Sequence, residues 1–503
     1  MQQRFFRNLA FLLTLNLLIK PFWILGIDRS VQNAVGEQAY GLYLSVYSFS
    51  FLFFILLDLG ITNYNNRNIA QNNHLLAKHF AGIATVKLLL GLLYSGVTFV
   101  VAWLIGYRGA QLHLLAWVGL NQILLSLILY LRSNISGLLL FKADSLFSVL
   151  DRLIMIVLCS LLLWSGWMPG PFQIVWYVYA QTLAYVITFV LALVYVMRHA
   201  GQLRLSFQAS FMLTILRRSL PYALLVLLMS FYNRLEPVLI ERLLPAEEAF
   251  SQTGIYGKAF RLLDAGNNIS LLFSVLLLPM FASMLKRREP VSQLVRMAFS
   301  IITAMSVIVA GLALAYSEEL MELMYGPLPE FTPQLFVRHV DESSLILRIL
   351  MGSFISVSIT YIFGTLLTAN GNLRMLNIIA GGGVAVNLVL NFVLIPRYQA
   401  VGAAWASFGV QAFTAAIQMG LAFSVFKLRF GRLYWWRLAE FIIIYAVLLA
   451  FSTVLPIPWF AGFALALTGG LLSTMLTRMI DPGDLKELVA SAGQHLKKNR
   501  NQD

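Results

Sequence analysis

Long apolar runs separated by short polar segments dominate the pattern of the chain. The runs are close to a membrane thickness in length and recur from residue 8 to residue 477. A helix needs about 20 residues to cross a hydrocarbon layer of about 30 Å, so each run predicts one spanning helix. A membrane barrel would instead alternate apolar and polar positions over short segments. The pattern predicts an all-α, polytopic membrane protein with about fourteen transmembrane helices.

The distribution of these runs predicts two six-helix lobes followed by two C-terminal helices. The expected spans are 8–27, 41–61, 80–105, 112–130, 145–164, 172–197, 220–240, 254–280, 291–316, 343–367, 374–395, 401–427, 435–455 and 459–477. The expected domains are an N-lobe (1–197), a cytoplasmic basic connector (198–219), a C-lobe (220–428), the last two spans (429–478) and a cytoplasmic polar tail (479–503).

Composition supports the membrane assignment. Of 503 residues 59% are hydrophobic and 12% are charged, whereas an ordinary soluble protein has about 25% charged residues. The net charge of +14 does not indicate nucleic-acid binding, because most cations lie in short loops beside the spans. The single cysteine, Cys159, excludes an internal disulfide.

Loop charges predict the orientation of the chain. Lysines and arginines are concentrated in the loops on one side of the expected spans. On the opposite side the loops hold Arg29, Arg108, Arg242, Arg338 and Arg397. The positive-inside rule therefore places both termini in the cytoplasm.

Two dipeptides recur at corresponding places in the two expected lobes. Lys20-Pro21 is followed by Tyr40-Gly41, and Glu236-Pro237 is followed by Tyr256-Gly257, with twenty positions from proline to glycine in both cases. Because each lobe has six spans, both start on the same side of the membrane. The sequence thus predicts a parallel repeat whose lobes enclose a central cleft.

Charged residues inside the expected spans mark the candidate site, because each costs about 2.5 to 3.5 kcal/mol at the centre of a membrane helix. The densest stretch runs from Asn233 to Asn268. Within it Lys258, Arg261, Asp264 and Asn268 fall on one face of a helix. Three interpretations stay open here: a structural Arg261–Asp264 lock, a binding site for an anionic cargo, and an ion-coupling site.

Other charges extend the set of candidates. Lys20 either faces a cavity or extends to the membrane surface. Asp151 and Arg152 are neighbours about 100° apart on the helix wheel, so we expect each to meet another helix rather than the other. The intramembrane cations are Lys20, Lys87, Arg152, Arg234, Lys258, Arg261 and Arg348, and the intramembrane acids are Asp58, Asp151, Glu236, Asp264 and Glu440.

Two stretches resemble a known family. The run IKPFWILGIDRSVQNAVGEQAYGLY from Ile19, with LLDLGITNYNNRNIA ending at Ala70, resembles the start of polysaccharide-biosynthesis flippases, and residues 368–403 with the following AWASFGVQ resemble a later part. These are the O-antigen and lipid-linked oligosaccharide exporters of the multidrug/oligosaccharidyl-lipid/polysaccharide (MOP) superfamily. The resemblance covers nearly the full length by topology.

The resemblance implies a monomeric, non-enzymatic flippase that moves an undecaprenyl-pyrophosphate-linked oligosaccharide from the inner to the outer leaflet by alternating access. It implies two lobes around a cationic cavity, with the last two spans forming a groove for the lipid tail. We expect no cofactor and no metal. The expected pyrophosphate-binding residues are Lys20, Arg29, Arg234, Lys258 and Arg261, with Lys87, Arg152 and Arg348 as secondary candidates. Coupling to a proton or sodium gradient would use Asp58, Asp151 or Asp264.

Two rival functions remain. A multidrug and toxin extruder (MATE) of the same superfamily would export organic cations, but seven intramembrane cations against five acids is the wrong excess for such a cargo. A membrane glycan polymerase, ligase or glycosyltransferase needs a catalytic constellation. His74 and His79 share one short loop without a third ligand, and no nucleophile with a paired base is evident.

Overall fold

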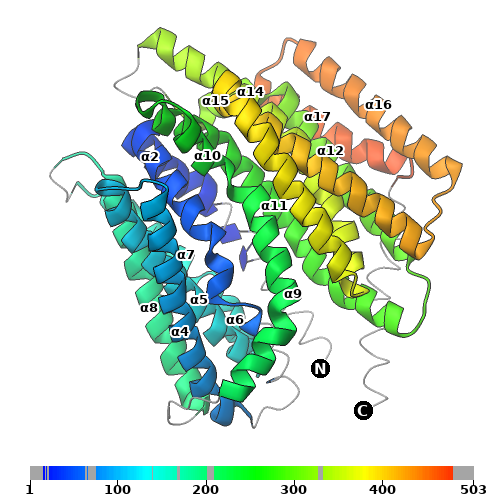
Figure 1. Cartoon of the computed structure of the whole chain (residues 1–503). Coiled ribbons are helices and arrows are strands. Elements are labelled where there is room, and N and C mark those ends of the chain that lie inside the picture. The colour runs from blue at the N-terminus through cyan, green and yellow to red at the C-terminus, as the bar shows by residue number, and fades with distance from the viewer. Residues whose placement is uncertain are drawn as a thin grey trace. The chain divides into compact units, whose positions relative to one another are not determined.

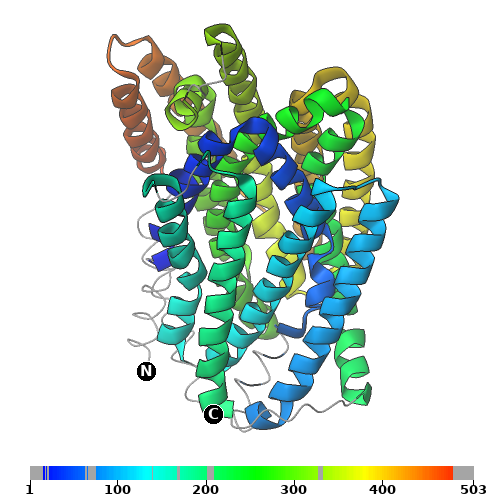
Figure 2. The ribbon, with the colours of Figure 1, turned by 90° about the vertical axis from the view of Figure 1, so that its left-hand side faces the viewer.

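The computed structural model describes residues 15–16, 18–19, 22–62, 65, 69, 75–138, 140–166, 170–200, 209–326 and 332–479. Lys20, residues 201–208 of the expected connector and the polar tail from residue 480 lie outside the described residues. The regular elements within the described ranges are helices (Figure 1 and Figure 2). They form two compact units, residues 3–254 and residues 255–503.

The first unit contains the helices of the expected N-lobe and the helix pair that follows it. Its elements are η1 (Trp23–Asp28), α2 (Arg29–Leu52), η2 (Phe54–Leu57), α4 (Leu75–Leu104), α5 (Ala110–Gly137), α6 (Phe141–Phe147), α7 (Leu150–Trp164), α8 (Ile174–Ala200), α9 (Ala209–Arg234) and α10 (Glu236–Leu243). The first turns of α11 (Ala246–Lys286) also belong to this unit.

The start of the chain departs from the expected spans. We expected a polar link over residues 28–40, but helix continues through most of this stretch because its polar side chains bond within the unit. Gly36 interrupts α2 with φ 77° and ψ 171°, a conformation that glycine adopts without a Cβ penalty. The chain therefore turns at one residue instead of over a long loop.

The core of the first unit is aromatic. Trp23, Tyr40, Tyr43, Tyr107 and Tyr177 are buried in one hydrophobic cluster with residues from α5 and α7. Val238 of α10 belongs to the same cluster. The short helix α10 is thus packed into the first unit, although its sequence follows the expected connector.

The second unit contains the remainder of α11 and six further helices. These are α12 (Ser292–Ala315), α13 (Ser317–Met324), α14 (Pro333–Ala369), α15 (Leu373–Phe426), α16 (Arg432–Val454) and α17 (Trp459–Leu476). Helix α15 has 54 residues and contains both the eleventh and twelfth expected spans. Gln399, with φ 52° and ψ −131°, divides it shortly after Pro396.

Helices α16 and α17 are fitted closely against α12. Tyr445 of α16 donates a hydrogen bond to the carbonyl of Ile308 at 2.8 Å, and Tyr316 donates to Ser452 Oγ at 2.8 Å. A Cβ on Gly311 would lie 2.6 Å from the Tyr445 ring, and a Cβ on Gly470 would lie 2.7 Å from it. The last two helices are therefore a fixed part of the second unit.

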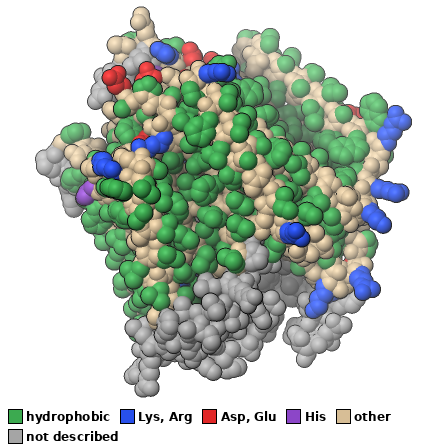
Figure 3. Space-filling view, viewed as in Figure 1, with side chains coloured by type: hydrophobic (Ala, Val, Ile, Leu, Met, Phe, Trp, Pro, Cys, Tyr) green, Lys and Arg blue, Asp and Glu red, His purple; other side chains and the backbone are tan. Residues whose placement is uncertain are grey.

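The described helices have the dimensions of a multi-pass membrane protein. Nine are long and apolar enough to cross a membrane, or up to ten if the bent pair 223–234 and 236–243, with an angle of 50°, is one span. On the described part of the face shown in Figure 3, hydrophobic side chains extend over the middle, and most charged side chains lie toward the edges. The predicted fold class, an all-α polytopic membrane protein, is confirmed at this level.

Candidate functional site

The candidate residues fall into two groups, one in each unit. Lys20 lies outside the described residues. The first unit contains Arg29, Asp58, Lys87, Asp151, Arg152 and Arg234, and the second contains Lys258, Arg261, Asp264 and Arg348.

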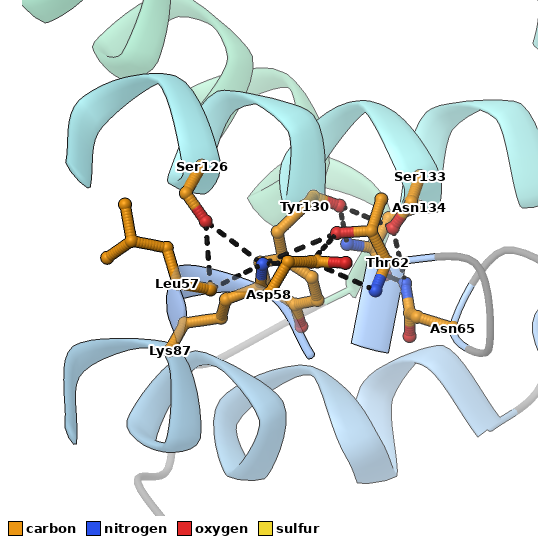
Figure 4. A network of polar contacts seen from close by, with 9 residues as sticks. All are labelled: Leu57, Asp58, Thr62, Asn65, Lys87, Ser126, Tyr130, Ser133 and Asn134. Atoms are coloured by element: carbon orange, nitrogen blue, oxygen red, sulfur yellow. Dashed lines mark hydrogen bonds and ion pairs between the residues drawn. The ribbon is translucent and has the colours of Figure 1, made fainter. Parts of the chain in front are cut away.

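A well-connected polar cluster surrounds Lys87 on α4. Its ammonium forms an ion pair with Asp58 and donates hydrogen bonds to the Leu57 carbonyl and to Ser126 Oγ, each at 3.0 Å (Figure 4). The Lys87 side chain is 1% exposed and that of Asp58 is 21% exposed. An ammonium removed from water needs an opposite charge and further acceptors, and this cluster supplies both.

The local chain explains why these acceptors face Lys87. After Leu52 the helix ends in the 3₁₀ turn η2, and Leu59 and Gly60 follow with φ of 45° and 83°. Ending a helix leaves backbone carbonyls without helical partners. The carbonyl of Leu57 accepts hydrogen bonds from both Lys87 and Ser126. Side chains of α4 and α5 thus replace the helical hydrogen bond that this carbonyl lacks.

A neutral polar layer adjoins the Lys87 cluster. Asn65 Nδ2 donates to Ser133 Oγ at 2.8 Å and to Asn134 Oδ1 at 3.0 Å, and Tyr130 donates to the Phe80 carbonyl at 2.7 Å (Figure 4). The layer joins the segment after η2 to α5, and α5 to α4. Asp58 and Lys87 are consequently held on both sides by helices of their own unit.

Arg152 meets another helix, as we expected, but it also pairs with Asp151, so our expectation that these neighbours would not meet each other is wrong. Arg152 Nε lies 3.7 Å from Asp151 Oδ2, and the guanidinium lies 5.5 Å from the centre of the Trp23 ring. A helical wheel compares only the directions of the Cα positions. A long side chain such as that of Arg152 can bend along the helix surface and reach its sequence neighbour. The cation thereby gains an acid and an aromatic face.

Asp28 is a buried acid that our reading of the sequence missed. Its side chain accepts hydrogen bonds from Tyr177 at 3.0 Å, from Tyr40 at 3.1 Å and from Gln32 at 3.1 Å, and the residue is 1% exposed. We had placed Asp28 in a loop outside the membrane, where a charged side chain is exposed to water and does not mark a site. The signal that could have found it is Gln32, one helical turn further along the chain.

The remaining candidates of the first unit have different surroundings. The Arg234 guanidinium, at the end of α9, lies 5.3 Å from the centre of the Phe51 ring of α2. Arg29 is the first residue of α2 and is half-buried. These two cations are attached to helices that pack together in one unit.

Lys258 and Arg261 lie on the long helix α11, as the sequence predicts. The Lys258 ammonium lies 5.3 Å from the centre of the Tyr325 ring, whose hydroxyl donates to the Lys258 carbonyl at 3.2 Å. Arg261 Nη1 lies 3.9 Å from Asp264 Oδ2, a loose ion pair. The Arg261–Asp264 contact that one of our three interpretations requires is therefore present, at a distance longer than a hydrogen bond.

Arg348 sits in a surface cluster. Its Nη2 donates to Glu318 Oε1 at 2.7 Å and its Nε donates to Ser317 Oγ at 2.6 Å. The Arg348 and Glu318 side chains are 37% and 55% exposed. Among the described residues no group of three His, Cys, Asp or Glu side chains is arranged to hold a metal ion.

Comparisons with known proteins identify the family. The family model described as polysaccharide biosynthesis protein matches residues 5–285, more than half of the chain. Among curated protein sequences none matches.

Several solved structures have a similar fold. The lipid II flippase MurJ in an inward closed conformation has a TM-score of 0.68 at 15% identity, covering 93% of this chain and 98% of that chain. The Vibrio cholerae MATE transporter VcmN has a TM-score of 0.57 at 16% identity, covering 85% and 97%. A MOP superfamily transporter from Pyrococcus furiosus has a TM-score of 0.52 at 15% identity, covering 84% and 93%. The chain therefore belongs to the polysaccharide biosynthesis protein family, and it has a fold similar to those of MurJ and the MATE transporters of the MOP superfamily.

Proposed function

We propose that this protein is a flippase that moves a polyprenyl-pyrophosphate-linked oligosaccharide from the cytoplasmic to the outer leaflet of a bacterial inner membrane. The observation that carries the proposal is the polysaccharide biosynthesis family match over residues 5–285, taken with a fold similar to that of a lipid II flippase. The protein acts as a transporter without chemical change to its cargo. It works as a monomer, without a cofactor.

The chemistry of the cargo accounts for cations inside apolar helices. A pyrophosphate cannot enter hydrocarbon unaided, and arginine and lysine replace its water of hydration with charge-assisted hydrogen bonds. Lys258 and Arg261 are the strongest headgroup candidates, because they lie about one turn apart on α11. The Tyr325 ring lies beside the Lys258 ammonium, and Asp264 forms a loose ion pair with Arg261. Lys20, Arg29 and Arg234 complete the proposed set, with Lys87, Arg152 and Arg348 as secondary residues.

The proposed architecture has fourteen spans, in two six-helix lobes with a final pair, and both termini in the cytoplasm. Support for this architecture comes from the nine described helices, or up to ten with the bent pair of α9 and α10, that are long and apolar enough to cross a membrane. We assign α11 to the eighth span, and the two parts of α15 to the eleventh and twelfth. Rocking of the two lobes would expose the headgroup site to each side in turn. Helices α16 and α17 would guide the polyprenyl tail, which need never leave the lipid.

Complementation of a deletion strain tests the proposal. Loss of the gene should cause lipid-linked glycan to accumulate on the cytoplasmic leaflet. Lys258→Ala and Arg261→Ala should each lower restored export at least about tenfold, the effect of losing one charge-assisted hydrogen bond. Lys286→Ala is the matched control, because Lys286 is an exposed cation in the last turn of the same helix and should restore export.

The contrary outcomes are distinct. Normal export in the deletion strain would remove the flippase function, whereas full rescue by both alanine variants would move the headgroup site elsewhere. Ion coupling through Asp58, Asp151 or Asp264 is tested in vesicles by collapsing the pH and sodium gradients separately. An unchanged transport rate in both cases would exclude coupling.

A second candidate function is antiport of organic cations, as in MATE transporters. Asp28 favours it, because a buried carboxylate surrounded by two tyrosine hydroxyls and an amide suits a cationic group. A drug-efflux assay separates the two functions. Resistance to cationic dyes that is lost in Asp28→Asn, with glycan export unaffected by gene deletion, would favour the antiporter.

A further inference from the structure

A buried carboxylate, Glu241, connects three segments of the first unit that are distant in sequence. It lies on α10, and its side chain is 5% exposed. Ser45 of α2 donates to Glu241 Oε2 at 2.9 Å, and Gln111 in the first turn of α5 donates to Oε1 at 2.8 Å. None of the proposed headgroup or coupling residues belongs to this cluster.

The link between α4 and α5 joins the same cluster through Tyr107. The Tyr107 hydroxyl lies 3.3 Å from Ser45 Oγ, and the Arg242 guanidinium lies 4.5 Å from the centre of the Tyr107 ring. Arg242 Nη2 also lies 3.1 Å from Glu241 Oε1. Burial, and then the neighbouring Glu241 charge, raise the pKa of Tyr107 well above its usual value, so its hydroxyl keeps its proton.

Immediately beside this cluster the backbone of α2 contacts the first turns of α11. A Cβ on Gly41 would lie 1.8 Å from the Phe250 carbonyl oxygen, and a Cβ on Gly254 would lie 2.2 Å from the Glu37 carbonyl oxygen. Glu37, Gly41 and Ser45 are four residues apart, so one face of α2 makes all these contacts. Ser48 is the next residue on that face and is fully buried.

We infer that Glu241 and its partners form a clamp that closes the outer end of the first unit, and that it must release α10 and α11 from α2 for cargo to leave. The inference rests on the proposed function, and its outer position rests on the orientation derived from the loop charges. A carboxylate bonded at both oxygens to separate helices suits this role, because loss of one charge removes several contacts together. The clamp is a gating device, and its residues do not touch the cargo.

Thiol labelling tests the clamp without requiring transport. Ser48→Cys in a Cys159→Ala background places one thiol behind the clamp, and Ser48 Oγ has no hydrogen-bond partner to lose. A membrane-impermeant maleimide added outside should label this introduced thiol slowly. Adding Glu241→Gln, which keeps the size but removes the charge, should raise the labelling rate by about tenfold or more.

Asp144→Asn is the matched control. Asp144 accepts from Arg132 Nε at 2.9 Å and is a partly buried carboxylate of the same unit, but it lies beside the opposite end of α5 from Gln111. It should leave the labelling of the introduced thiol unchanged. Ser45→Ala removes the hydroxyl that contacts Glu241 and Tyr107 but keeps the charge of the clamp, so it should raise the rate by a smaller factor than Glu241→Gln.

Unchanged labelling in both Glu241→Gln and Ser45→Ala would overturn the clamp. Faster labelling from the cytoplasmic side alone would overturn its outer position. If Glu241→Gln opens the introduced thiol to the outside while the deletion strain exports glycan normally, the clamp stands and the flippase function fails.

Discussion

At the scale of single residues, the buried charges described above are stabilised by polar or aromatic groups that lie next to them in space. Lys87 has an acid, a carbonyl and a hydroxyl within its reach, and Arg152 has an acid and an indole ring. Removing one partner of a buried ion pair leaves an uncompensated charge, which is more harmful than removing both partners. This asymmetry gives a direct test of the Lys87 cluster.

We predict that Lys87→Met lowers the free energy of unfolding by about 3 kcal/mol, because Asp58 loses its counter-charge and the Leu57 carbonyl loses a donor. Thermal unfolding of the purified protein in detergent, followed by tryptophan fluorescence, measures the change. The double variant Lys87→Met/Asp58→Asn should recover part of the loss. A double variant less stable than Lys87→Met would contradict the account.

Sequence analysis could recognise the charges but not all of their partners. Lys87 and Asp58 were singled out because each interrupts an apolar run, yet their pairing depends on the break after Leu52, which no local pattern marks. Asp28 was missed because the residues around it contain enough polar groups to resemble a loop. Two of the three donors to Asp28 are distant from it in sequence: Tyr177 lies on α8, and Tyr40 lies beyond Gly36. Hydropathy does not encode such long-range contacts.

At the scale of helices, glycine decides where backbones come closest. Gly41 of α2 and Gly254 of α11 face carbonyl oxygens of the partner helix at distances that exclude any side chain. Close approach between helices in a membrane commonly uses small residues in this way. Most helix positions followed from apolar length, and the break at Gln399 lies in the expected link between the spans 374–395 and 401–427. The break at Gly36 was expected as a long polar link, because hydropathy does not show that one residue is enough to turn the chain.

We predict that Gly41→Ala destabilises the protein by about 1 to 3 kcal/mol or more, since the new methyl group has no room beside the Phe250 carbonyl. The same thermal unfolding measurement applies. Gly96→Ala is the control, because nothing lies within 4 Å of a Cβ there and the residue is within α4. It should be neutral or stabilising by up to about 1 kcal/mol. Equal effects of the two substitutions would refute the close packing of α2 and α11.

At the scale of the whole molecule, loop charge predicts the orientation of the chain. The link before α11 carries little positive charge, whereas the link between α11 and α12 contains Arg287 and Arg288 beside Lys286. The positive-inside rule places the first link outside and the second in the cytoplasm. Ala246 and Lys286 are exposed residues at the two ends of α11, and so they can report these positions.

In a Cys159→Ala background, we predict that a membrane-impermeant maleimide labels Ala246→Cys in intact cells and labels Lys286→Cys only after permeabilisation. The reason is that our span assignment makes α11 cross the membrane once between these two positions. Gel detection of the labelled protein gives the result. The reverse pattern would invert the orientation, and labelling of both in intact cells would show that α11 does not cross.

The close fit of α16 and α17 against α12 limits how this protein can be shortened. Gly311 and Gly470 leave space that the Tyr445 ring fills, and Tyr316 depends on Ser452 for its hydrogen bond. A chain ending before Arg432 would present this groove and an unbonded tyrosine hydroxyl to lipid. The remaining helices would therefore not fold stably without the final hairpin. We expect membrane proteases to degrade such a truncated protein before it could be assayed.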